Sequence, residues 1–190
     1  AYGGNKANNR YSPLTQINID NVKDLQVAWT YFANDKPDST QKVPDPRETQ
    51  CQPIVVDGIL YGTSAEVNLF ALNAGTGEQL WKFEPIKGTH SYRTTRGVMY
   101  WENGDDKRIF FTAGSFLYAV DALAGKSIVT FGDSGRVDLH EGLADNLDHD
   151  VTELSVTASS PGVIYKNTLV IGSTVSEGGN AAPGHIRAFD

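Results

Sequence analysis

The 190-residue chain has little of several features that mark other classes of protein. Cys51 is its only cysteine, so no disulfide can form within the chain, and the cysteine count leaves the redox compartment open. No apolar run approaches the roughly 20 residues that a membrane-spanning helix needs. The first residues do not form a basic segment followed by an apolar one, so a signal peptide either never existed or has been removed.

Basic residues are in the minority, with 16 Lys and Arg against 23 Asp and Glu and a net charge of −7. This balance argues against nucleic acid as a partner, because phosphates select basic surfaces. Aromatic residues are plentiful, with eight Tyr, eight Phe and three Trp against a single Met. That composition suits a rigid fold built from β-strands.

A hairpin pattern is the main organising feature of the chain. Residues 69–72 are an alternating apolar run, residues 73–78 are a link rich in Asn, Gly and Thr, and residues 79–83 are a second run. Two such runs with a short glycine-containing link predict a β-hairpin. Asp57-Gly58 predicts a second hairpin over residues 53–63, and residues 162–172 predict a third.

The first of these patterns recurs along the chain. It returns at residues 116–126 and begins again at residues 185–190, and its alanines are Ala71, Ala119 and Ala188, 48 and 69 residues apart. A short-strand repeat of about 40–50 residues is typical of a β-propeller with one four-stranded blade per repeat. We therefore predict an all-β fold, a β-propeller.

At this repeat length, residues 1–190 hold about three to four blades of a single propeller domain. Residues 1–25 are predicted to be a lead-in segment, and the alternating residues 26–31 a strand. The acidic residues 131–155 are predicted to be the insertion that lengthens the second interval. Because so few blades cannot close a ring, we expect an N-terminal piece of a longer protein, stable only with the remainder or by self-association.

Two segments carry a family resemblance. Residues 71–81 resemble the tryptophan-docking motif of quinoprotein dehydrogenases, with Asn73 where aspartate is usual. In the second repeat, Ala124 replaces the threonine and Val129 stands where tryptophan would dock. Residues 2–29 closely resemble the mature N-terminus of dehydrogenases that depend on pyrroloquinoline quinone (PQQ). The resemblance implies an eight-bladed propeller and a periplasmic or otherwise extracytoplasmic location, with the signal peptide removed.

Arg96 is the first candidate for a functional residue. From the residues alone, an arginine before a strand is more often a surface residue. Arg96-Gly97 resembles the family segment whose arginine lies beside the quinone oxygens and carboxylates of PQQ, which implies that Arg96 contacts the cofactor. A guanidinium suits this task because it remains charged and donates hydrogen bonds in a fork.

Residues 172–177 form the second candidate site. In methanol-type relatives the matching loop contacts a cofactor carboxylate and its glutamate binds calcium, which implies that Thr174 contacts PQQ and Glu177 binds Ca²⁺. Carboxylate oxygen is the ligand that a hard cation prefers, although a lone glutamate in a glycine-rich loop is usually just solvated. Ser159 is a further cofactor candidate, and the spacing around Pro161 also allows a one-residue shift.

Gln50 and His90 are the remaining candidates. Gln50 stands three residues before Pro53, where many relatives have a glutamate that contacts the cofactor; the alternative is an ordinary polar residue before an inner strand. His90-Ser91 stands where methanol- and ethanol-type relatives have two adjacent cysteines. Their absence favours the sugar-oxidising, glucose-dehydrogenase-like subgroup, with His90 either lining the substrate pocket or exposed in a loop.

The resemblance implies a PQQ- and calcium-dependent dehydrogenase that transfers hydride from a sugar or alcohol hydroxyl to the quinone. The aspartate base and most calcium ligands are expected beyond residue 190, so this piece alone is expected to be inactive. A cytochrome or a membrane quinone would accept the electrons. The alternative is a non-catalytic propeller with the same repeats, such as an outer-membrane assembly lipoprotein, which has no reason to keep Arg96-Gly97 or Glu177.

Overall fold

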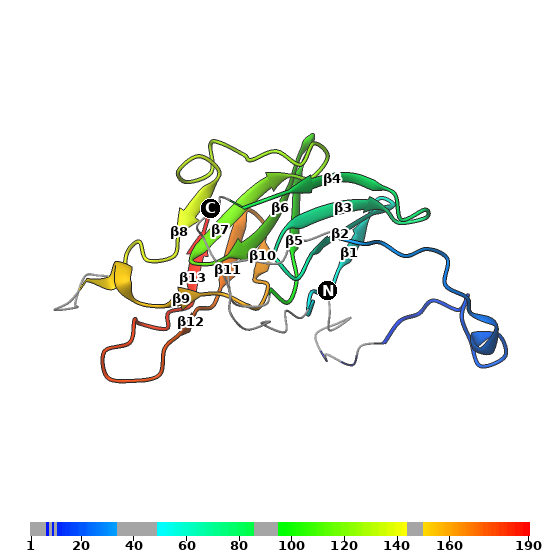
Figure 1. Cartoon of the computed structure of the whole chain (residues 1–190), viewed down its shortest axis with the longest axis horizontal. Coiled ribbons are helices and arrows are strands. Elements are labelled where there is room, and N and C mark those ends of the chain that lie inside the picture. Colours follow the sequence, from blue (N-terminus) through cyan, green and yellow to red (C-terminus); the bar gives the residue numbers. More distant parts are fainter. Residues whose placement is uncertain (1–6, 8, 10, 34–48, 86–94, 144–149) are drawn as a thin grey trace, which may run out of the picture. The chain divides into compact units, whose positions relative to one another are not determined.

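The computed structural model describes residues 7, 9, 11–33, 49–85, 95–143 and 150–190 (Figure 1). The chain divides into two compact units, residues 1–30 and residues 31–190. The described part of the first unit contains one short 3-10 helix, η1 (Val22–Asp24). The strand predicted over residues 26–31 is wrong: no strand is present there, and the Val27 side chain is 83% exposed. Alternation predicts a strand only where a partner edge supplies hydrogen bonds, and no described strand pairs with this segment.

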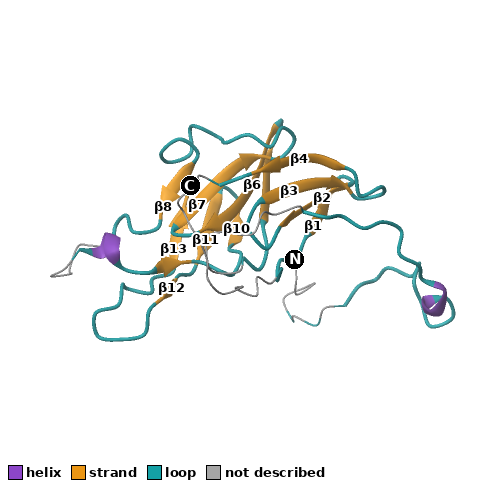
Figure 2. Ribbon diagram, in the orientation of Figure 1, coloured by secondary structure: helices purple, strands orange, loops and turns teal. Residues whose placement is uncertain are grey.

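The first sheet of the second unit has four antiparallel strands in chain order (Figure 2). They are β1 (Ile54–Val56), β2 (Ile59–Thr63), β3 (Leu69–Asn73) and β4 (Gln79–Phe83). Asp57 and Gly58 both have positive φ, 50° and 78°, which confirms the predicted primed turn between β1 and β2. The predicted hairpin formed by β3 and β4 is confirmed as well.

The second sheet repeats this arrangement. Its strands, again antiparallel and in chain order, are β5 (Met99–Asn103), β6 (Asp106–Ala113), β7 (Phe116–Asp121) and β8 (Arg136–Asp138). β8 falls inside the insertion predicted over residues 131–155, so the first part of that segment belongs to the sheet. The prediction missed this strand because three residues are too few to show alternation.

The third sheet contains β10 (Val163–Tyr165), β11 (Thr168–Ile171) and β13 (Arg187–Phe189). A separate two-stranded ladder pairs β9 (Val156–Thr157) with β12 (Thr174–Val175), and the 3-10 helix η2 (Val151–Glu153) precedes β9. The all-β prediction is confirmed. The three sheets correspond to three of the predicted blades, and they do not close into a ring.

The motif alanines occupy the same place in all three sheets. Ala71 pairs with Tyr61 and Trp81, Ala119 pairs with Phe110, and Ala188 pairs with Val170. The repeat in the sequence is therefore a repeat in the register of the strands. In the first two sheets these rows are largely buried, whereas in the row of the third sheet Ala188 is exposed and Val163 is 70% exposed.

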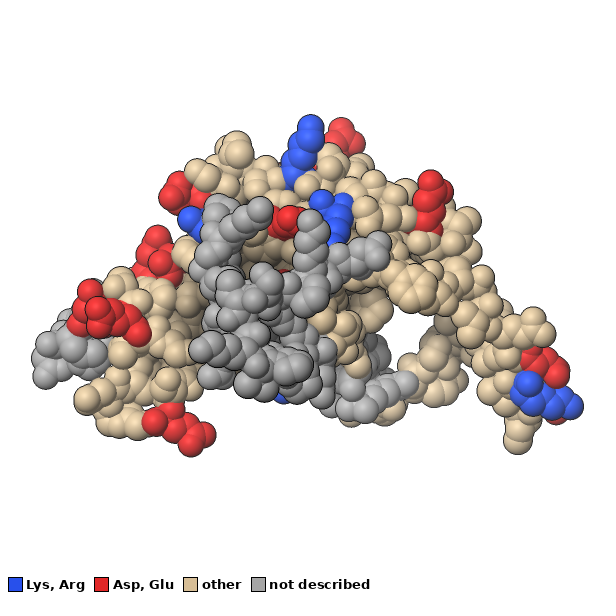
Figure 3. Space-filling model, in the orientation of Figure 1, with Lys and Arg blue, Asp and Glu red and all other residues tan. Residues whose placement is uncertain are grey.

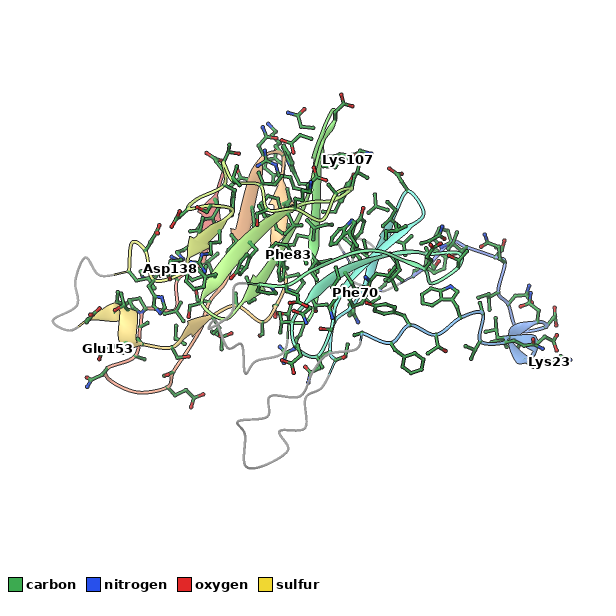
Figure 4. All side chains as sticks on the ribbon, turned by 45° about the horizontal axis from the view of Figure 1, so that its top comes forward. Lys23, Phe70, Phe83, Lys107, Asp138 and Glu153 are labelled. Carbon is green, nitrogen blue, oxygen red and sulfur yellow. The ribbon has the colours of Figure 1, made fainter. Side chains whose placement is uncertain are left out.

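Trp81 joins the first sheet to the second. Its indole Nε1 donates to the carbonyl oxygen of Ala122 at 3.0 Å, and the Tyr61 hydroxyl donates to the same oxygen at 3.2 Å. Phe83 extends this contact, with its ring 6.0 Å from the rings of Phe111 and Tyr118 (Figure 4). The interface is thus an aromatic core closed by two hydrogen bonds.

Different residues join the second sheet to the third. Val129, which stands at the tryptophan position of the motif, is 70% exposed. Trp101 of β5 donates instead from Nε1 to the carbonyl oxygen of Lys166, at 3.0 Å. Arg187 of β13 donates to the carbonyl oxygens of Leu139 and Glu141, just after β8. At the second interface, a tryptophan on the first strand of the second sheet and an arginine of the third sheet therefore make the hydrogen bonds.

Tyr61 makes the first interface sensitive to alkaline pH. Burial raises the pKa of Tyr61 to about 12, and the negative charges of Asp57 and Asp121 add to this effect. Unfolded tyrosine loses its proton near pH 10, so Tyr61 contributes its full stability below pH 10 and loses it as the pH rises to 12. We expect the free energy of unfolding of the full-length protein to fall by about 1.4 kcal/mol per pH unit in this window on account of Tyr61.

Chemical denaturation between pH 9 and pH 12 measures this loss. Tyr61→Phe should make the decline shallower, and replacing the exposed Tyr165 with Phe is the matched control. An equally steep decline in Tyr61→Phe and the wild type would contradict the assignment.

Candidate cofactor site

Three segments lie side by side and form what we call the central ribbon: residues 50–52 before β1, residues 95–97 before β5, and residues 158–159 between β9 and β10. The Gln52 amide donates to the Arg96 carbonyl oxygen at 3.0 Å, and the Arg96 amide donates to the Ser159 carbonyl oxygen at 2.8 Å. Gln52 and Gly97 also form a parallel bridge. The main chain of Arg96 is therefore fixed from both sides.

Two buried threonines, Thr95 in the ribbon and Thr112 outside it, hold the second and third segments of the ribbon by hydrogen bonds. Thr95 and Thr112 are each 5% exposed, and the Thr95 hydroxyl donates to the Thr112 carbonyl oxygen at 2.8 Å. The Thr112 hydroxyl donates in turn to the carbonyl oxygen of Ala158. Thr112 lies on β6, so the second sheet holds the second and third segments of the ribbon in place.

The ribbon brings three of the predicted site residues together. Gln50, Arg96 and Ser159 all lie on it, and Arg96 Nε is 3.5 Å from Gln50 Oε1. The Arg96 side chain is exposed, and it has no ion pair with a carboxylate among the described residues. It can therefore donate to an incoming acidic ligand.

Thr174 lies next to the third segment of the ribbon. It pairs with Thr157 across the β9–β12 ladder, and its carbonyl oxygen accepts from the Thr157 hydroxyl at 3.4 Å. Thr157 is two residues before Ser159. The strand pairing thus places two candidate hydroxyl groups, those of Ser159 and Thr174, on neighbouring segments.

Glu177 is exposed in the loop after β12, and no contact joins it to the described part of the ribbon. Across residues 7, 9, 11–33, 49–85, 95–143 and 150–190, no group of three His, Cys, Asp or Glu residues could hold a metal ion. Glu177 thus stays a prediction as a calcium ligand. His90 lies outside the described residues.

The chemistry of the ribbon suits a ligand with several carbonyl or carboxylate oxygens. Arg96 supplies a charged fork of donors, Gln50 an amide, and Ser159 and Thr174 hydroxyl groups. PQQ fits this donor set, because it is a quinone with carboxylate groups. The chain as a whole is acidic, and on the face drawn in Figure 3 the acidic side chains stand at separate places rather than in one cluster.

Comparison with known proteins agrees with this chemistry. Residues 1–190 match the PQQ family described as glucose/ethanol/alcohol dehydrogenase, beta-propeller domain. The chain belongs to this family. Among similar proteins of the family, quinoprotein glucose dehydrogenase A of Acinetobacter calcoaceticus is 33% identical to the whole chain. Quinoprotein glucose dehydrogenase of Escherichia coli strain K12 is 32% identical over the same extent.

A solved structure of the same family gives the same fold. The quinohemoprotein alcohol dehydrogenase of Comamonas testosteroni superposes on 99% of the chain with a TM-score of 0.74 and 27% sequence identity. The chain spans 26% and 25% of the two glucose dehydrogenases and 24% of this alcohol dehydrogenase. In the part of the chain that the structure describes, no helix is long and apolar enough to cross a membrane.

Proposed function

We propose that this chain is the N-terminal part of the propeller of a PQQ-dependent dehydrogenase that oxidises a hydroxyl group of a sugar or alcohol. The observation that carries the proposal is the central ribbon, which joins Gln50, Arg96 and Ser159 within a chain whose whole length matches the PQQ family. A non-catalytic scaffold needs no such convergence. When bound, PQQ would supply the acceptor for the hydride taken from the substrate.

The residues of this chain bind the cofactor and stabilise charge on it. Arg96 donates from a guanidinium whose main chain is fixed on both sides, so little reorganisation is needed as negative charge develops on a bound oxygen. The Gln50 amide lies beside the guanidinium without neutralising it. Ser159 and Thr174 supply neutral donors to carboxylate oxygens. Glu177 binds Ca²⁺ together with ligands from other parts of the full-length protein.

We favour a sugar over an alcohol as the substrate. The single cysteine, Cys51, accepts a hydrogen bond from the Thr63 amide at 3.2 Å, and no second cysteine is available for a disulfide ring over the cofactor. The similar proteins include both glucose and alcohol dehydrogenases, so the preference rests on the cysteines. We further propose a periplasmic location and a cytochrome or membrane quinone as electron acceptor.

Reconstitution of the full-length protein tests this function. We expect the apoprotein to reduce a redox dye only after PQQ and Ca²⁺ are both added, and faster with glucose than with ethanol. Glu177→Gln should raise the calcium concentration needed for half activity by about tenfold, because an amide is a weaker ligand than a carboxylate.

Glu153→Gln is the matched control, because Glu153 is another exposed glutamate and lies in η2. It should leave the calcium requirement unchanged. No PQQ binding at any calcium level would favour the non-catalytic propeller instead. Dye reduction that needs neither PQQ nor calcium would refute the dependence on these cofactors.

A further inference from the structure

Gly97 lies in the central ribbon with little free space around it. A Cβ atom on Gly97 would lie 3.2 Å from Pro161 Cγ and 3.5 Å from the Gln52 carbonyl oxygen. Gly97 is buried, and its φ is not among the positive values of the chain. The backbone conformation therefore does not require glycine, and the limit on a side chain there is space: Pro161 would have to shift by a few tenths of an ångström to admit a Cβ.

The spacing at Gly97 also affects the positions of the three candidate cofactor-binding residues of the ribbon. Arg96 directly precedes Gly97, Gln50 is two residues before Gln52, and Ser159 is two residues before Pro161. The segments are joined by the Gln52–Arg96 and Arg96–Ser159 hydrogen bonds of 3.0 and 2.8 Å. A shift of Gly97 or Pro161 to admit a side chain would act on the segments that these bonds join, and so on the candidate side chains that they carry.

We propose that Gly97 is a positioning residue that keeps the ribbon narrow enough for Gln50, Arg96 and Ser159 to bind one PQQ molecule. This rests on the proposed function for the identity of the ligand. Gly97 itself has no side chain to offer the cofactor, so it acts through the separation of the segments. A misplacement of well under 1 Å is enough to weaken such a site.

The first test needs no cofactor. In the full-length protein, Gly97→Ala should speed amide hydrogen exchange in the peptides containing Gln52 and Arg96, because their hydrogen bonds span the widened ribbon. Gly75→Ala is the control: its Cβ would meet only Asn73 Oδ1 at 3.4 Å, in the turn of the first sheet. Unchanged exchange in Gly97→Ala would overturn the proposal.

The second test measures PQQ affinity by quenching of tryptophan fluorescence, without substrate. Gly97→Ala should weaken binding roughly tenfold, while Gly75→Ala should not. Adding Pro161→Ala to Gly97→Ala should restore most of the affinity, because it removes Pro161 Cγ and leaves Cβ at 3.7 Å, an ordinary contact. This rescue would not follow from a general loss of stability.

The outcomes separate the proposal from the function on which it rests. Full affinity in Gly97→Ala, or no rescue by Pro161→Ala, overturns the positioning role. A wild-type protein that binds no PQQ refutes the proposed function, and the exchange experiment then decides the spacing role of Gly97 alone.

Discussion

Replacing Arg96 with alanine in the full-length protein should weaken PQQ binding by about two orders of magnitude. Hydrogen bonds to a charged group contribute about 1.5–3 kcal/mol, and about 1.4 kcal/mol corresponds to a tenfold change in affinity. Arg96 is the charged donor of the ribbon, and its guanidinium can form a fork of hydrogen bonds to the ligand. Among the described residues it has no ion pair with a carboxylate that would compete with the ligand. Titration of PQQ into apoprotein with calcium present measures the effect.

Two variants separate charge from geometry at this position. Arg96→Lys keeps the charge and loses the planar fork, so an intermediate loss of about tenfold is expected. Arg136→Ala removes an arginine of β8 that stacks 4.2 Å over the Phe116 ring, and it should leave PQQ affinity unchanged. Equal affinity in Arg96→Ala and Arg136→Ala would show that the ribbon is not the cofactor site.

Gly125→Ala should destabilise the full-length protein by about 3 kcal/mol. Gly125 has a φ of +66°, which costs other residues about 1–2 kcal/mol. Its new Cβ would also lie 2.6 Å from Cδ2 of the Trp81 ring, and such overpacking costs about 1–3 kcal/mol. The substitution thus pushes Trp81 off the turn on which it docks. The midpoint of denaturant unfolding measures the loss.

Gly104→Ala is a close control for this prediction. Gly104 has a φ of +61°, nearly that of Gly125, yet nothing lies within 4 Å of its added Cβ. The difference between the two variants therefore isolates the contact with Trp81. In a Trp81→Ala background the two substitutions should cost the same. A persistent excess for Gly125→Ala there would show that the tryptophan ring is not the cause.

Local turn chemistry made the sheets predictable. Asp57-Gly58 specifies a turn with two positive φ angles, and the structure has both. The alanine repeat predicted equivalent positions, and the register places Ala71, Ala119 and Ala188 alike. These features depend on neighbouring residues, so a single sequence is enough to find them.

Features that depend on partners were less predictable. Residues 26–31 alternate without forming a strand, and β8 is too short to alternate at all. Trp101 contacts the third sheet from β5, and Val129, at the tryptophan position of the motif, is exposed. Which aromatic residue fills a sheet-to-sheet interface is decided by packing across the interface, and the order of residues along one strand does not contain that information.

The site residues came from resemblance, and their arrangement came from the structure. Arg96 is 46 residues after Gln50 and 63 residues before Ser159 in the sequence. Only the hydrogen bonds between the segments of the central ribbon bring the three residues together. Thr95 and Thr112, which brace that ribbon, were missed, because a threonine near a strand gives no signal of its own. The role of Glu177 depends on ligands outside the described residues and stays a prediction.

A crystal structure of the full-length protein with PQQ and calcium tests the central claim most directly. The account predicts PQQ at the central ribbon, with the Arg96 guanidinium within hydrogen-bonding distance of its quinone or carboxylate oxygens and Gln50 and Ser159 beside it. PQQ bound away from the ribbon, with Arg96 turned to solvent, would contradict the account.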